Sequence, residues 1–316
     1  MIFIYQLIII LEHSENSLIL EILVKDKRNT KMEELNQDIP ATEATNSEIE
    51  TPKSEILTVP TMAQMAAEGK TPEILFWVGC AGSFDERAQK ITRSICKILQ
   101  HVGMSYAVLG TEESCTGDPA KRAGNEFLFQ MQAMVNIDVL NGYEVKKIVT
   151  GCPHCFNTLK NEYPQLGGNY EVIHHTQLIQ QLIDEGKLKT QDGESFKGKK
   201  ITYHDACYLG RGNNVYEAPR AALEVLDAEL VEMKRFKSNG LCCGAGGAQM
   251  FKEPEKGKRE ISDERIDDAI AIQANIVASA CPFCMTMLRD GVKHHEKEDD
   301  IQVLDIAEIT VRANGL

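Results

Sequence analysis

Short apolar runs alternate with longer amphipathic stretches along the chain from Glu73 onward. Ile74–Val78 is continuously apolar, Ile91–Val102 carries apolar residues at helical spacing, and Ala107–Leu109 is apolar again. Such alternation is typical of layered α/β folds. In the first half it predicts strands at 74–78, 106–109, 146–149 and 171–174, with helices at 84–102, 119–141, from near 153, and at 176–185.

The same succession returns after a connector rich in glycine and lysine, Gly193–Lys200. It predicts strands at 200–204, 229–232 and 275–278, helices at 216–226, 262–273 and from near 282, and a glycine-rich loop at 240–247. We therefore expect an α/β protein of two tandem, pseudo-symmetric domains with parallel-type sheets, packed face to face. The expected domains are residues 71–192 and 198–316.

Residues 1–70 lack this periodicity and are expected to form an N-terminal tail or linker without ordered structure. The opening run Ile2–Leu11 is too short to span a bilayer and lacks the flanks of an export signal. We hypothesise that translation starts at Met32, because residues 1–31 resemble nothing that follows. The expected location is the cytoplasm, where thiols stay reduced and available to metals.

Charge and composition narrow the class of protein. The 316 residues include 34 basic and 47 acidic side chains, a formal net charge of −13, and this balance argues against nucleic-acid binding. Hydrophobic residues make up 43% of the chain and the mean hydropathy is −0.26, which describes a soluble chain with material for a core. Ten cysteines are too dilute for a disulfide scaffold, so their spacing is the informative feature.

The cysteines repeat together with the predicted strands. Four of them recur at offsets of 127, 128, 129 and 129 residues, which pairs Cys80 with Cys207, Cys115 with Cys243, Cys152 with Cys281 and Cys155 with Cys284. A ninth, Cys242, aligns with Ser114. Because the carboxyl ends of parallel strands meet at one edge of a sheet, we expect three strand ends of each repeat to converge on one ligand.

The number of thiols in each repeat bears on the kind of ligand. Each Cys-Pro-x-Cys motif begins a predicted helix, whose N–H groups and positive end stabilise thiolates, the ligands of soft metals and iron–sulfur clusters. Zinc takes four ligands, so five thiols in the second repeat point to several irons. Burial as a small hydrophobe explains the lone Cys96 but not a repeated spacing. A thioredoxin-like pair leaves Cys80, Cys207 and Cys242–Cys243 unexplained.

The second repeat resembles a known family. Cys207, then Cys242-Cys243-Gly244, then Cys281-x-x-Cys284 is similar to the cysteine-rich (CCG) domain of the heterodisulfide reductase B-subunit family. His204–Arg211 resembles the family's segment around its first cysteine, with Ala206 in place of the usual proline. The resemblance covers roughly residues 72–310. Within the family, the chain is similar above all to short iron–sulfur proteins that accompany a separate ferredoxin-type subunit.

This resemblance implies a noncubane 4Fe-4S cluster held by Cys207, Cys242, Cys243, Cys281 and Cys284. In heterodisulfide reductases such clusters cleave a disulfide in successive one-electron steps. In other members of the family they serve electron transfer linked to flavoproteins or quinones.

The first repeat departs from the pattern, because Ser114-Cys115 stands where the second repeat has Cys-Cys. Four thiols remain, and they are Cys80, Cys115, Cys152 and Cys155. Three interpretations follow: a second 4Fe-4S cluster on four thiolates, a structural zinc site as in some family members, or a noncubane cluster in which Ser114 or a nearby group substitutes. We favour a second iron–sulfur cluster over zinc.

Polar residues beside Cys207 are the candidate catalytic residues. His204 and Asp205 end a predicted strand, where the imidazole would donate a hydrogen bond to cluster sulfur or a proton. A histidine satisfied in the core is the alternative for His204. Arg211 would neutralise the negative charge of the cluster or substrate.

Three further histidines lie near the predicted sites. His154 is expected to be an exposed spacer between Cys152 and Cys155 rather than a ligand. His174 and His175 follow a strand and are expected to approach the cleft between the repeats.

The expected function is that of the 4Fe-4S subunit of a heterodisulfide-reductase-like oxidoreductase complex. It would carry electrons between a ferredoxin-type or flavoprotein partner and a disulfide, a quinone or an electron-transfer flavoprotein. The chain has no ferredoxin run of cysteines and no dinucleotide fingerprint, so these cofactors are assigned to partners, through which it would also associate peripherally with a membrane. The alternatives are a zinc-stabilised scaffold and a metal-free thiol–disulfide oxidoreductase.

Overall fold

The computed structural model describes residues 57–189, 193–253 and 257–316. Residues 1–56 of the expected tail, Met32 included, lie outside the described residues. The chain from Pro60 to Leu316 is one compact unit. It opens with helix α3 (Met62–Ala67), which begins at a capping box made by Thr61 and Gln64, so ordered structure starts before residue 70.

The first repeat is built on a four-stranded sheet in the order β2-β1-β3-β4, and all its strand pairs are parallel. The strands are β1 (Ile74–Trp77), β2 (Tyr106–Ala107), β3 (Lys147–Thr150) and β4 (Glu171–His174). Every residue of β1 is buried. A strand covered on both faces needs apolar side chains throughout, which is why the sequence shows an uninterrupted apolar run there.

The second repeat has the same topology, with parallel strands in the order β6-β5-β7-β8. Its strands are β5 (Lys200–Tyr203), β6 (Glu229–Leu230), β7 (Ile276–Ser279) and β8 (Gln302–Asp305). Each strand of one repeat has a counterpart in the other. The predicted architecture of two pseudo-symmetric α/β repeats with parallel sheets is confirmed.

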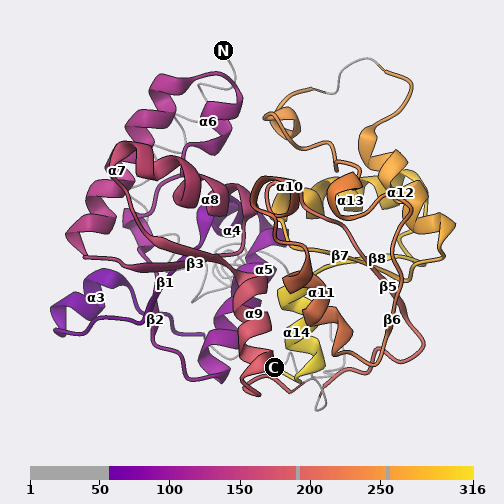
Figure 1. Cartoon of the computed structure of the whole chain (residues 1–316), viewed down its shortest axis with the longest axis horizontal. Helices are drawn as coiled ribbons and strands as arrows, with labels where there is room; N and C mark the ends of the chain where they lie inside the picture. The colour runs from indigo at the N-terminus through magenta and orange to yellow at the C-terminus, as the bar shows by residue number, and fades with distance from the viewer. Residues whose placement is uncertain (1–56, 190–192, 254–256) are drawn as a thin grey trace, which may run out of the picture. The chain divides into compact units, whose positions relative to one another are not determined.

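Helices connect the strands of both sheets (Figure 1). In the first repeat they are α4 (Gly79–Phe84), α5 (Glu86–His101), α6 (Asp118–Arg122), α7 (Glu126–Gly142), α8 (Pro153–Asn157) and α9 (His175–Asp184). In the second they are α10 (Gly210–Asn213), α11 (Glu217–Glu224), α12 (Ile261–Ala271), α13 (Pro282–His294) and α14 (Ile306–Ala313). Within the described ranges, no helix has the length and apolar character needed to cross a bilayer.

Two features of the helices differ from the sequence prediction. The single helix expected at 119–141 is two helices, α6 and α7, because Gly124 takes the left-handed conformation with φ of 87° and Asn125 caps the N-terminus of α7. The last strand and helix, β8 and α14, were not predicted. β8 has only four residues and follows the charged run Lys293–Asp300, so it shows too few positions for a pattern.

The two repeats meet through helices, with α5 packed against α14 and α9 packed against α11. Arg87 of α5 donates to both carboxylate oxygens of Glu308 on α14, at 2.8 and 2.5 Å. Behind this pair, Nε2 of His175 at the start of α9 lies 3.0 Å from Oδ1 of Asp305, and both side chains are almost inaccessible to solvent. Polar contacts with specific geometry therefore fix how the repeats face each other.

Removing the Arg87 side chain should weaken this contact. In the Arg87→Ala variant Glu308 keeps its largely buried carboxylate but loses its charged partner. We expect the free energy of unfolding to fall by roughly 1–3 kcal/mol, between the values for exposed and fully buried pairs, as measured by equilibrium urea denaturation. Lys90→Ala, at an exposed position of the same helix, is the control and should change stability by less than about 0.5 kcal/mol. Equal losses in the two variants would mean that the pair contributes nothing net.

Candidate metal centre

The four repeated cysteines of the first repeat line a single pocket. Cys80 lies in α4 after β1, Cys115 follows the 3-10 turn η2 (Gly110–Glu112) after β2, and Cys152 precedes α8 after β3, with Cys155 inside α8. The thiol of Cys80 is hydrogen-bonded to that of Cys115, and the thiol of Cys152 to that of Cys155. Three strand ends therefore bring four thiols to one place.

The turn that carries Cys80 is held to the turn that carries Cys115 by Glu113. Its carboxylate accepts hydrogen bonds from the backbone N–H groups of Val78 at 3.0 Å and Gly79 at 2.6 Å. Burial raises the pKa of Glu113 to about 7, against the lowering effect of these two N–H groups. Gly79 has φ of 77°, and a Cβ there would lie 3.2 Å from the sulfur of Cys155, so this glycine leaves room beside the thiols.

Helix α7 holds the Ser114–Cys115 segment from the other side through Asn136, which is fully buried. Its amide nitrogen donates to the carbonyl oxygen of Cys115 and to the hydroxyl oxygen of Tyr163, both at 3.0 Å. Its amide oxygen accepts from the hydroxyl of Ser114 at 2.9 Å. The Ser114 hydroxyl is thus bonded to α7, and Ser114 is not among the residues that line the pocket.

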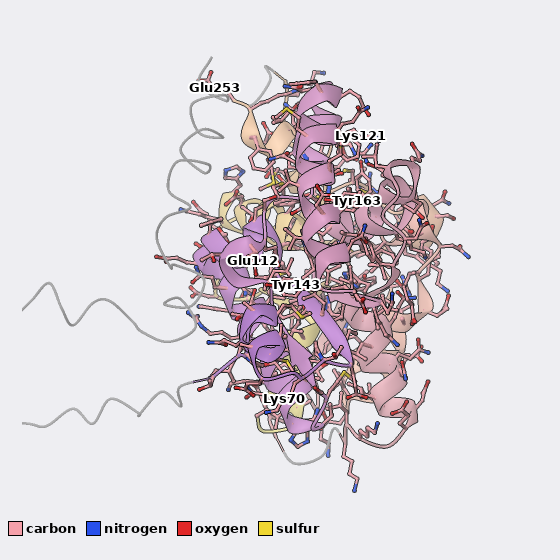
Figure 2. All side chains as sticks on the ribbon, turned by 90° about the vertical axis from the view of Figure 1, so that its left-hand side faces the viewer. Lys70, Glu112, Lys121, Tyr143, Tyr163 and Glu253 are labelled. Carbon is pink, nitrogen blue, oxygen red and sulfur yellow. The ribbon has the colours of Figure 1, made fainter. Side chains whose placement is uncertain are left out.

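A second contact joins the end of α7 to the strand-end segment. The hydroxyl of Tyr143, the residue after α7, donates to the carboxylate of Glu112 at 2.6 Å, and Figure 2 labels these two residues next to each other. Hydrogen bonds from Asn136 within α7 and from Tyr143 at its end therefore fix the backbone around Cys115. Sequence reasoning missed Asn136, although a polar residue among the buried positions of α7 is a detectable signal.

In the second repeat five thiols form one hydrogen-bonded series. Cys207 follows β5, Cys242 and Cys243 lie in the loop between η5 (Lys237–Asn239) and η6 (Gln249–Phe251), and Cys281 and Cys284 begin α13 after β7. The hydrogen bonds join Cys207 to Cys242, Cys242 to Cys243, Cys243 to Cys284, and Cys284 to Cys281.

Cys242 is the thiol in this series that ionises most readily. Its pKa is lowered chiefly by the hydrogen bonds of Cys207 and Cys243, and the backbone N–H of Gly244 adds to the effect from 3.3 Å. Gly244 takes φ of 97°, a left-handed conformation that suits glycine and turns its N–H back onto the sulfur. A thiolate at this position is prepared for a metal.

The loop that carries Cys242 is anchored to the end of β5. Asp205 accepts two hydrogen bonds from Arg220, at 2.8 and 2.9 Å, and one from the backbone N–H of Lys237 at 2.6 Å. Arg211 donates to the carbonyl oxygen of Gly240 at 2.6 Å. The two candidate catalytic residues Asp205 and Arg211 thus position the loop, and their catalytic role stays a prediction.

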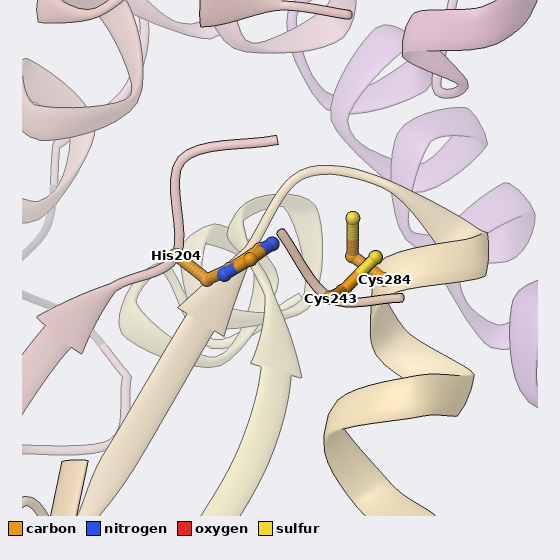
Figure 3. Close-up of side chains that lie close together, drawn as sticks. All are labelled: His204, Cys243 and Cys284. Atoms are coloured by element: carbon orange, nitrogen blue, oxygen red, sulfur yellow. The ribbon is translucent and has the colours of Figure 1, made fainter. Parts of the chain in front are cut away.

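His204, at the end of β5, lies beside the thiols. One of its ring nitrogens and the sulfurs of Cys243 and Cys284 all lie within 4.8 Å of one another. Figure 3 shows the three side chains directed toward one another. The ring is buried, and burial followed by the charge of Arg265 lowers the pKa of His204 to about 3. The other ring nitrogen, Nδ1, lies 3.0 Å from Nε of Arg265. Sequence reasoning missed Arg265, which gives no local signal because it lies 61 residues from His204.

The two centres touch each other. The thiols of Cys152 in the first repeat and Cys281 in the second are hydrogen-bonded. Phe283 of the second repeat lines the pocket of the first-repeat cysteines. The sites are therefore neighbours, joined by the residues that begin α8 and α13.

The expectation for His154 was wrong, because the ring is buried with 8% exposure. Its centroid lies 4.4 Å from that of Tyr208 and 5.0 Å from that of Phe283, both in the second repeat. Nδ1 lies 2.7 Å from a carboxylate oxygen of Asp118. Burial lowers the pKa of His154, but the hydrogen bond with Asp118 and the charges of Cys152 and Asp118 together raise it by more. The net shift of the pKa is therefore upward. Tyr208 and Phe283 of the second repeat cover the His154 ring, which the local sequence alone could not reveal.

His174 and His175 lie at the contact between the repeats. His175 reaches across to Asp305, and the ring of His174 lies against it, tilted by 50° with the centroids 4.3 Å apart. Cys96 is fully buried in α5 and does not line the pocket of the first-repeat cysteines, and burial raises its pKa to about 12. All ten cysteines are free of disulfides, so nine thiols are available as ligands at two adjoining places.

Comparison with known proteins adds three findings. The model of the cysteine-rich domain CCG matches residues 74–160 and 201–289. The chain is 46% identical over 265 residues to the probable iron-sulfur-binding oxidoreductase FadF of Bacillus subtilis, and the match covers 84% of this chain and 37% of FadF. It is 43% identical over 252 residues to the EtfAB:quinone oxidoreductase of Syntrophomonas wolfei, covering 78% of this chain and 35% of that protein.

A third relative is a component of the dihydromethanophenazine:CoB–CoM heterodisulfide reductase of Methanosarcina barkeri, its D subunit. The identity is 36% over 251 residues, which cover 77% of this chain and 59% of that relative. The chain thus spans from 35% to 59% of the length of these relatives.

Asn136→Ala should disturb the first centre selectively. The change leaves the carbonyl of Cys115 and the hydroxyl of Tyr163 without their partner, at a cost of about 1–3 kcal/mol. We expect less metal per chain in the first repeat and unchanged metal in the second, measured by elemental analysis of anaerobically purified protein. Asp138→Ala, on the exposed side of α7, is the matched control. Full metal content and wild-type stability in Asn136→Ala would contradict the role given to Asn136.

Proposed function

This chain belongs to the family of proteins that carry the CCG cysteine-rich domain, here in two copies, and on that premise we propose that it is an iron–sulfur subunit of an oxidoreductase complex. The observation that carries the proposal is the series of five hydrogen-bonded thiols in the second repeat. One zinc ion takes four ligands and leaves the fifth thiol unused. The names of the relatives, an iron–sulfur oxidoreductase, a quinone oxidoreductase and a heterodisulfide reductase subunit, support a redox role.

The donor set of the second repeat fits a 4Fe-4S cluster of the noncubane kind. Its ligands would be Cys207, Cys242, Cys243, Cys281 and Cys284. When bound, the cluster supplies one-electron chemistry at a potential set by hydrogen bonds and burial. The chain contributes a low-pKa thiol, Cys242, a turn at Gly244 that directs an N–H at its sulfur, and the Asp205–Arg220 pair that holds the loop.

The donor set of the first repeat fits a four-thiolate site. Cys80, Cys115, Cys152 and Cys155 line the pocket, whereas the hydroxyl of Ser114 is bonded to Asn136. This geometry favours four ligands over a site completed by Ser114. We assign a second 4Fe-4S cluster to it, with zinc as the alternative.

The contact between Cys152 and Cys281 gives the two centres a functional relation. A ligand of one site hydrogen-bonds a ligand of the other, so an electron that enters at one repeat is next to the second site. Both thiols are buried, and water has little access to the path between them. Two adjoining one-electron sites suit a substrate that takes two electrons: a disulfide, a quinone or the flavin of an electron-transfer flavoprotein.

The proposed partner is a ferredoxin-type subunit or a flavoprotein, which would deliver or receive electrons. The names of two relatives, an EtfAB:quinone oxidoreductase and a heterodisulfide reductase subunit, support a role beside other redox proteins. A cytoplasmic location and peripheral membrane association through such a partner remain predictions.

Metal and sulfide content tests the proposal directly. We would measure iron, zinc and acid-labile sulfide per chain on anaerobically purified protein, with electron paramagnetic resonance after mild oxidation. About eight irons would mean two 4Fe-4S clusters, and about four irons with one zinc would mean a redox second repeat on a structural first repeat. Zinc without iron would overturn the redox function and favour the scaffold. Metal-free protein with a reactive thiol would favour a thiol–disulfide oxidoreductase.

Substitution of Cys242 should separate a cluster ligand from a buried cysteine. We expect Cys242→Ser to lose most of the visible absorbance and iron of the second site, because the substitution removes the thiol that ionises most readily. Cys96→Ser makes the same atomic change at a buried position outside both centres and should keep the iron content. Wild-type iron in Cys242→Ser would sink the assignment of Cys242.

A further inference from the structure

Arg265 and His204 form a buried hydrogen bond next to the second centre. Arg265 comes from α12 and is fully buried, and its Nε lies 3.0 Å from Nδ1 of His204 at the end of β5. This contact lies on the side of the ring that faces away from the thiols. Neither residue is needed to explain the five-thiol donor set.

The chemistry of the two side chains fixes which ring nitrogen carries the proton. A guanidinium has only donors, so Nε–H of Arg265 requires a lone pair on Nδ1 of His204. The proton of the neutral imidazole must then sit on Nε2. A doubly protonated ring would oppose two donors at 3.0 Å, which the geometry excludes.

The protonated nitrogen faces the sulfurs. With Nδ1 engaged by Arg265, Nε2 is the nitrogen that lies within 4.8 Å of the sulfurs of Cys243 and Cys284. Figure 3 shows the far end of the ring directed toward these two sulfurs. A nitrogen that bears a proton has no lone pair for a metal, so the group of His204, Cys243 and Cys284 is not a three-ligand metal site in this tautomer.

We propose that His204 donates a hydrogen bond from Nε2 to a cysteine sulfur that holds the cluster in the second repeat, that of Cys243 or Cys284, and that Arg265 is the positioning residue that fixes this tautomer. This inference rests on the proposed iron–sulfur function. Reduction adds negative charge to the cluster, and part of that charge resides on sulfur. A donor at this place stabilises the reduced state and raises the reduction potential.

Arg265 is itself held in place. Its Nη1 donates to the carbonyl oxygen of Arg235 at 2.6 Å and to Asp268 at 3.2 Å. Asp268 also binds the side chain of Arg235. The guanidinium therefore has one orientation, and Nε points at the imidazole whatever the state of the cluster.

A pair of variants at position 204 tests the hydrogen bond. In His204→Leu the donor is lost, and we expect the midpoint potential of the second-repeat cluster to shift to a more negative value in a redox titration followed by electron paramagnetic resonance. His204→Gln can accept from Arg265 through its amide oxygen and donate through its amide nitrogen, so it should restore most of the wild-type potential. Iron per chain is measured for every variant.

Variants of the arginine test the positioning role. Arg265→Met frees the tautomer and should shift the potential in the same direction as His204→Leu. The double variant should shift it no further than His204→Leu alone, because the two residues act through one hydrogen bond. Arg259→Met is the matched control: it breaks an exposed ion pair with Asp267 of the same helix, and Arg259 belongs neither to the network that holds Arg265 nor to the contacts of His204. Its potential should match the wild type.

Pulsed electron paramagnetic resonance separates a donor from a ligand. We expect weak coupling to nitrogen and an exchangeable proton coupling that disappears in D₂O and in His204→Leu. Strong nitrogen coupling, or an unchanged potential in His204→Leu at full iron content, would overturn this inference alone. Wild-type protein without iron would overturn the proposed function and the inference with it.

Discussion

The arrangement of both centres depends on the contact between Cys152 and Cys281. Each residue follows an inner strand of its four-stranded sheet, β3 or β7, and is the N-cap residue of the helix that comes next. For the two thiols to meet, the carboxyl ends of the two sheets must face each other, and the helices at the contact between the repeats must pack in a way that allows this. The Arg87–Glu308 and His175–Asp305 pairs also join the two repeats, and their fixed geometry opposes sliding of one repeat against the other.

The polar groups behind the strand ends are unusual in their burial. His175 and Asp305 are almost inaccessible, and each keeps one polar side-chain atom without a hydrogen-bond partner in the described part of the chain. An unsatisfied buried polar atom is costly, so this pair is weak evidence for stability. Its value lies in specificity, because only one docking of α9 on α14 brings the two side chains together.

The alternation of apolar runs with amphipathic stretches was enough to predict α/β layers, and the repeated cysteine spacings were enough to predict the duplication, because ligands at strand ends recur together with the strands. The local sequence pattern gave wrong or no predictions where a residue's environment is set by residues far away in the chain. His154 looks exposed between two cysteines, yet Tyr208 and Phe283 cover it. The role of Arg265 cannot be predicted from its local sequence, because only the fold brings it next to His204, 61 residues away. β8 was missed because a four-residue strand after a charged run has no periodicity to read.

Phe283 belongs to the Cys-Pro-x-Cys motif of one repeat but walls the pocket of the other. The first-repeat pocket is therefore completed by a side chain of the second repeat. Because both repeats belong to one polypeptide, this wall stays in place at any protein concentration. The two repeats also need not carry the same ligands, and Ser114 stands where the second repeat has Cys242.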